Sequence, residues 1–280
     1  MKQKLLLSFL PILCLSQNSY ANEYADKVFK NKNEVVLGSL NINLNIGYSS
    51  YLIDVSSTEL NRAIDYNVLE ATMGLSYIFN NKIGVGIDTK MLLDESQSNL
   101  TIDSDEKPLN DTASLDRKEF TLYGNYFFNE NSIINIFYKY SNLEANDSYD
   151  AFRHYDTTFN YTSNGLALSY VFIPINLDKH KLWLSAGGVY SSADIEIFEK
   201  IDGVEDDVFI DDTQNGFGLK LGLGYIYRFS DNLDFKITGD WYSSDFGELD
   251  VNSKVLGGVL ESASLDETTY SIRVGVGYKF

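Results

Sequence analysis

The chain has 280 residues and carries 22 Lys and Arg against 40 Asp and Glu, for a formal net charge of −18. A protein this acidic is a poor candidate for binding nucleic acid, because phosphates would repel it. Twenty Tyr, 17 Phe, 20 Gly and only 3 Pro are typical of a β-rich protein. The single cysteine, Cys14, lies in a segment that we expect to be removed. We therefore expect no disulfide, no metal and no other cofactor.

Residues 1–21 have the plan of a cleaved secretory signal peptide. Two lysines precede the apolar run Leu5–Leu15, which is too short to span a bilayer as a helix. A small-x-small cleavage site ends at Ala21. Residues 22–37 then form a polar periplasmic lead-in, and residues 38–280 form one structural domain.

Within residues 38–280, ten segments of about 10 to 14 residues alternate apolar and polar side chains, the pattern of β-strands. The predicted strands are about Gly38–Ser50, Tyr66–Phe79, Ile83–Met91, Lys118–Phe128, Ser132–Ser141, a segment ending at Phe172, a segment starting near Lys181, Phe217–Phe229, Leu233–Trp241 and Tyr270–Phe280. Short turns are expected near residues 80, 130, 176 and 231. Long connections are expected at 50–65, 94–117, 142–159, 192–215 and 243–268.

These strands fit a membrane barrel better than a soluble sandwich. Their apolar faces carry almost no charge, and their length is near that of a tilted membrane-spanning strand. Aromatic residues gather at the strand ends, as interfacial girdles require. Five Tyr-x-Phe triplets fall at the short-turn end: Tyr77–Phe79, Tyr126–Phe128, Tyr170–Phe172, Tyr227–Phe229 and Tyr278–Phe280. We predict an all-β fold: a single transmembrane antiparallel up-and-down β-barrel of about 10 strands, within a range of 8 to 12.

The last strand, Y-S-I-R-V-G-V-G-Y-K-F, ends the chain on an aromatic residue. In this it resembles the Gram-negative outer-membrane β-barrel proteins, whose assembly machinery reads a terminal aromatic; Tyr278 and Phe280 match that signal. The resemblance implies an outer-membrane location, short periplasmic turns and long extracellular loops. It also implies contact with lipid, lipopolysaccharide and the barrel-assembly machinery. Ten strands is the size of the omptin proteases, but the loop that would match their His-bearing loop, 192–215, has no histidine.

The polar strand faces would line the lumen. The lumen-lining candidates are Glu70, Asp88, Lys90, Lys139, Lys220, Arg228, Asp234, Lys236, Asp240 and Arg273. They allow a narrow pore for a small solute or a self-neutralising plug. The expected register favours the plug, because it puts Arg228 opposite Asp234 and makes Glu70 diagonal to Lys90 and Lys220 diagonal to Asp240.

The predicted loops 94–117 and 192–215 are rich in Asp and Glu. Their carboxylates allow Ca²⁺ or Mg²⁺ binding that bridges to lipopolysaccharide phosphates, but the spacing of a Ca²⁺ loop is absent and a solvated surface is favoured. Arg153-His154-Tyr155-Asp156 is the one place in the predicted long loops where a histidine lies beside a carboxylate. The sequence therefore predicts a non-enzymatic porin-like channel or a structural, surface-exposed barrel. The alternatives are an enzyme at the extracellular rim and an adhesin-type protein with an unspecified ligand.

Overall fold

The computed structural model describes residues 39–280 apart from 57–60, 81, 94–97, 103–104, 109–113, 151–153, 202–207 and 254–258. The expected signal peptide and lead-in lie outside these residues. The strands are β1 (Ser39–Ser56), β2 (Asn61–Ile78), β3 (Ile83–Leu92), β4 (Ser98–Ile102), β5 (Asp105–Pro108), β6 (Ser114–Asn129), β7 (Ser132–Asp150), β8 (His154–Asn176), β9 (His180–Ile201), β10 (Val208–Arg228), β11 (Leu233–Ser253) and β12 (Val259–Lys279). In this part of the chain no helix is long and apolar enough to cross a membrane.

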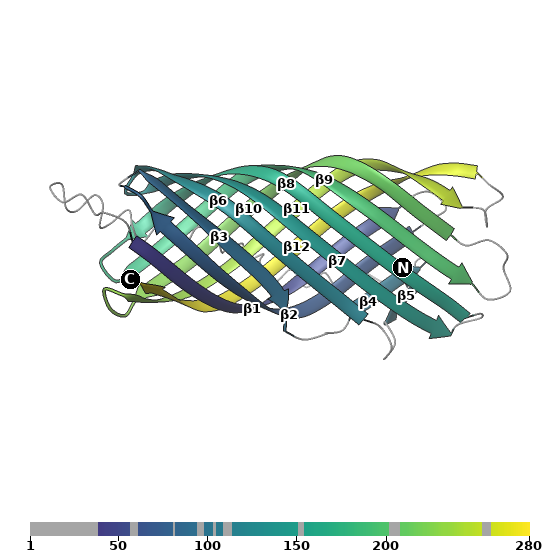
Figure 1. Cartoon of the computed structure of the whole chain (residues 1–280), viewed down its shortest axis with the longest axis horizontal. Helices are drawn as coiled ribbons and strands as arrows, with labels where there is room; N and C mark the ends of the chain where they lie inside the picture. Colours follow the sequence, from purple (N-terminus) through teal and green to yellow (C-terminus); the bar gives the residue numbers. More distant parts are fainter. Residues whose placement is uncertain are drawn as a thin grey trace, which may run out of the picture.

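Ten of the strands form a closed antiparallel barrel, with each strand paired to its neighbours in sequence. The barrel closes because β1 pairs with β12, from Asn41 opposite Lys279 to Ser56 opposite Ser264. The short strands β4 and β5 form a hairpin that extends the sheet above β3, with β4 pairing to the upper part of β2. Figure 1 shows the strands inclined to the long axis of the barrel. The fold prediction is confirmed, including the count of ten.

The strands are longer than the sequence pattern predicted, and the loops are correspondingly shorter. β8 has 23 residues and β9 has 22, so much of the predicted loops 142–159 and 192–215 is strand. At about 3.3 Å per residue and a tilt of about 40°, a 21-residue strand rises about 50 Å along the barrel axis, twice the roughly 25 Å apolar band of an outer membrane. The upper half of the barrel wall therefore stands above the membrane.

The lower half of the outer surface is an apolar belt. Leu44, Ile46 and Tyr48 of β1 are about half exposed, and the outward positions of the other strands in this zone are also mostly large and apolar. Water would not tolerate a continuous belt of this kind, whereas lipid requires it. Phe79, Phe128, Phe172, Phe229 and Phe280, all exposed, form the ring at the short-turn end.

The phase of the alternation inverts where the strands leave this belt. On β1 the apolar side chains face outward up to Tyr48, and then Tyr51, Ile53 and Val55 face inward and are buried. The same change on the other strands gives the upper lumen an apolar filling, which we call the extracellular plug. Its members are Tyr51, Ile53, Val55, Tyr66, Val68, Leu115, Leu143, Ala145, Phe159, Tyr161, Ala193, Ile195, Ile197, Phe246, Ala263 and Leu265.

Candidate functional site in the barrel lumen

Ten charged side chains lie in the lumen beneath the extracellular plug, and we call them the central charge layer. They are Glu70, Asp88, Lys90, Arg117, Glu119, Lys139, Lys220, Asp240, Glu267 and Arg273. They come from seven strands, because inward positions at one height of a closed barrel face one another whatever their distance in sequence. Five are acidic and five are basic, so the layer has no net charge when all are ionised.

Glu119 of β6 is the most connected member of the layer. Its Oε1 lies 3.1 Å from Lys90 Nζ and 3.3 Å from Arg117 Nη2, and its Oε2 lies 3.3 Å from Lys139 Nζ. Arg117 also contacts Glu267 of β12 at 3.3 Å. One carboxylate thus receives three cations from β3, β6 and β7.

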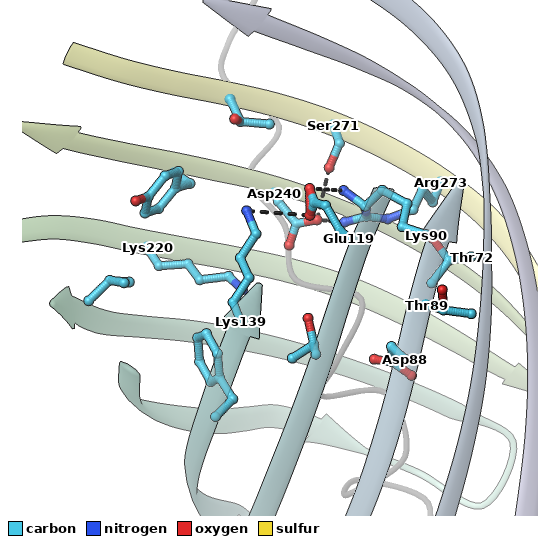
Figure 2. Close-up of a pocket in the computed structure, with 15 residues that line it drawn as sticks. Thr72, Asp88, Thr89, Lys90, Glu119, Lys139, Lys220, Asp240, Ser271 and Arg273 are labelled. Atoms are coloured by element: carbon cyan, nitrogen blue, oxygen red, sulfur yellow. Dashed lines mark hydrogen bonds and ion pairs between the residues drawn. The ribbon is translucent and has the colours of Figure 1, made fainter. Parts of the chain in front are cut away.

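A second group of contacts joins β12 to β2 and β11. Arg273 donates to Glu70 Oε1 at 3.2 Å and forms an ion pair with Asp240, and Ser271 Oγ donates to Asp240 Oδ2 at 2.8 Å. Glu70 also lies 3.3 Å from Lys90, which links the two groups. Figure 2 shows Lys90, Glu119, Asp240 and Arg273 close together in the lumen. A buried charge that loses such a partner is costly, so the pairing holds the strands in one arrangement.

Three tyrosines attach the charge layer to the extracellular plug. The Tyr51 hydroxyl donates to Glu70 Oε2 at 2.7 Å, and the Tyr161 hydroxyl donates to Glu267 Oε2 at 2.7 Å. Arg117 donates to the Tyr66 hydroxyl at 2.6 Å, while its guanidinium lies 3.8 Å from the centre of the Tyr51 ring. Each ring is part of the plug and each hydroxyl belongs to the layer, so the two zones are packed as one body.

Inward glycines make room for large side chains instead of widening a channel. A Cβ on Gly86 would lie 2.3 Å from the Tyr123 ring, and a Cβ on Gly224 would lie 2.3 Å from the Trp183 ring. Both rings are buried. A Cβ on Gly277 would lie 2.5 Å from Lys236 Nζ. These three glycines therefore accommodate large side chains and do not widen the lumen.

The predicted lumen residues divide between two levels. Glu70, Asp88, Lys90, Lys139, Lys220, Asp240 and Arg273 belong to the central charge layer, while Arg228, Asp234 and Lys236 lie nearer the short-turn end. Arg228 is opposite Asp234 at 3.8 Å, and Glu70 contacts the diagonal Lys90, as the register predicted.

Lys220 is diagonal to Asp240, as the register predicted, but the two side chains do not form an ion pair among the described residues. Asp240 pairs instead with Arg273 on its other neighbour, β12. Lys220 turns its ammonium to the Phe137 ring, at 4.3 Å from the ring centre.

Sequence reasoning missed Arg117, Glu119 and Glu267. Arg117 and Glu267 fall within the predicted loops 94–117 and 243–268, because the outward apolar pattern stops before it reaches them. The signal that would have found them is the inverted alternation itself: Leu115, Arg117 and Glu119 continue the inward phase of β6.

The predicted assembly residues lie at the short-turn end of β12. The rings of Tyr278 and Phe280 pack edge to face with centroids 4.9 Å apart. The Phe280 amide donates to the Leu40 carbonyl at 3.0 Å, so the terminal residue also closes the seam between β12 and β1.

At the extracellular end, His154 lies where β8 begins. Ser148 Oγ and Asp156 Oδ1 each lie 3.3 Å from the same ring atom, Nε2. A catalytic triad needs the hydroxyl on one ring nitrogen and the carboxylate on the other, so these contacts do not form a relay. Among the described residues no group of three or more His, Cys, Asp or Glu side chains is arranged to hold a metal ion.

No known family model and no curated protein matches the sequence. Solved structures do match the fold. The outer membrane protease OmpT from Escherichia coli superposes with a TM-score of 0.62 at 12% identity, covering 89% of this chain and 99% of that chain. The translocator domain of the autotransporter NalP from Neisseria meningitidis gives 0.53 at 14% identity, covering 97% and 100%. Identities this low show a common fold and carry over no activity.

Proposed function

We propose that this outer-membrane β-barrel protein is a closed, non-enzymatic barrel that acts through its extracellular surface, as a structural or adhesin-type protein, and not as a through-pore. The observation that carries the proposal is the extracellular plug. Side chains from eight strands fill the upper lumen, and a dry apolar layer of this kind excludes ions and water.

The central charge layer, which lies beneath the plug, also supports a closed barrel. Most of its cations and anions form ion pairs with one another at distances of 3.1 to 3.3 Å. A selectivity lining works by leaving charges free to exchange with a passing solute. Side chains fill barrels of about eight strands, and ten strands enlarge the lumen only slightly.

The wall above the membrane is polar on its outside and suits contact with lipopolysaccharide. Asn142, Thr162, Asp194 and Thr213 form one outward row across β7 to β10. Hydrogen bonds of 3.2 Å (Asn142 to Thr162) and 2.6 Å (Thr213 to Asp194) join members of this row. The row lies just above the membrane-facing Tyr190 and Phe217, where the sugars of an outer leaflet begin. We include lipopolysaccharide as a partner on this ground, beside the lipid that the belt requires.

The barrel-assembly machinery is the second proposed partner. It would read Tyr278 and Phe280, whose rings are about half exposed or more, on the strand that closes the barrel.

The deciding experiment is reconstitution of the purified full chain into planar bilayers. We expect no discrete conductance steps for a protein whose insertion is verified by heat-modifiable migration on gels. Reproducible steps from the verified, folded wild-type protein would refute the closed barrel and restore the narrow pore.

A further inference from the structure

A cavity of about 70 Å³ lies within the central charge layer, and two of the charges that line it have no counter-charge within 4 Å among the described residues. Asp88 of β3 is 5% exposed, and neither of its carboxylate oxygens has a hydrogen-bond partner. Lys220 of β10 also lines the cavity, and its ammonium contacts only the Phe137 ring among the described residues. Figure 2 shows the two side chains at different sides of the same cavity.

Two charges of opposite sign without an ion-pair partner, Asp88 buried and Lys220 partly buried, are costly, because each has lost water without gaining a counter-charge at contact distance. The other eight members of the layer each have a counter-charge within 4 Å. The cavity therefore presents one acceptor and one donor to whatever fills it. The Thr72 and Thr269 hydroxyls, which are buried and unbonded, add neutral polar contacts.

The charge balance selects the kind of occupant. The layer sums to zero, so a bound anion or cation would leave an uncompensated charge in a medium of low dielectric constant. A molecule with one ammonium and one carboxylate preserves the balance and satisfies both groups. One water position takes about 10 to 15 Å³ of such a cavity, so it has room for about five or six non-hydrogen atoms.

The lumen differs in polarity above and below the cavity. Above it, the extracellular plug closes the lumen. Below the cavity, an apolar cluster that includes Phe127, Trp183 and Ile226 fills one side of the lumen. Its side chains come from β2 and from the consecutive strands β6 to β10. The side formed by β11, β12 and β1 is polar, with Lys236 bonded to Asn43 at 2.6 Å.

We propose that the central cavity is a binding site for a small zwitterion, with the ligand's carboxylate on Lys220 and its ammonium on Asp88. Glycine, with five non-hydrogen atoms, is the smallest α-amino acid of this class.

The test is equilibrium dialysis of the detergent-purified full chain against radiolabelled glycine. Saturable binding of one glycine is expected, with no competition from acetate or methylammonium at equal concentration, since each supplies only one of the two charges. Asp88→Asn and Lys220→Met should each weaken binding by about 10- to 100-fold, the worth of one charged hydrogen bond. Lys118→Gln, on the exposed outer face of β6, should leave it unchanged.

Heat-modifiable migration verifies that each variant is folded, and both variants fill nearly the same volume as the residue replaced. Absence of saturable glycine binding to the wild-type protein would overturn the proposal, as would full competition by acetate or unaltered binding in both folded cavity variants. Binding does not require a through-pore, so these results are independent of the conductance measurement.

Discussion

Replacement of Glu119 by Gln should strongly destabilise the barrel, because it removes the carboxylate that three cations share. After the change, Lys90 keeps Glu70 at 3.3 Å and Arg117 keeps Glu267 at 3.3 Å. Among the described residues, Lys139 keeps only the Tyr242 ring, whose centre lies 5.3 Å from the ammonium. A buried ion pair that loses one partner costs about 3 to 5 kcal/mol. We expect the lower end, about 3 kcal/mol, because Gln still accepts a hydrogen bond.

The measurement is equilibrium unfolding in urea of the protein folded into phospholipid vesicles, followed by tryptophan fluorescence. With a slope of about 3 kcal/mol per molar urea, the loss corresponds to a fall in midpoint of about 1 M. The matched control is Lys118→Gln on the same strand, whose partner Asp116 is also exposed; this change should leave the midpoint unaltered. Adding Lys139→Met to Glu119→Gln should recover part of the loss, since it removes the orphaned cation. Equal midpoints for the Glu119 and Lys118 variants would refute the inference that Glu119 holds the layer together.

Two further predictions concern packing and assembly. Gly86→Ala should lower the unfolding free energy by about 1 to 3 kcal/mol, because its Cβ would meet the Tyr123 ring and overpack the lumen. The control is Gly124→Ala, where nothing lies within 4 Å of the added Cβ. Equal shifts of the urea midpoint in the two variants would contradict the packing argument. Deleting Phe280 should reduce the fraction of folded protein in outer membranes, measured by heat-modifiable migration, far more than Phe128→Ala does. Both changes remove one ring of the periplasmic girdle, so equal defects would mean that Phe280 acts only as a girdle aromatic.

Much of the fold followed from local alternation. Leu44, Ile46 and Tyr48 face lipid because side chains alternate along a strand. That pattern, together with the Tyr-x-Phe strand ends, predicts the apolar belt, the ten strands and the end of the barrel that carries the short turns. The prediction failed where the pattern inverted. Tyr51, Ile53 and Val55 are apolar like the belt but lie on the opposite face, so the strand continues to Ser56, beyond the predicted end at Ser50.

The sequence by itself determined which side chains face inward in the membrane zone, because the side-chain period of a strand is a local property. Only the tertiary structure decided which inward charges meet. Arg117 and Glu267 are 150 positions apart, and Asp240 had candidate partners on both neighbouring strands. Closure between β1 and β12 brings Arg273 to Glu70 of β2, while Arg273 reaches Asp240 from the adjacent strand, and Lys220 and Asp88 are left facing the cavity. The side chains that fill the lumen come from strands that are remote in sequence. The alternation along one strand carries no information about which of them will meet.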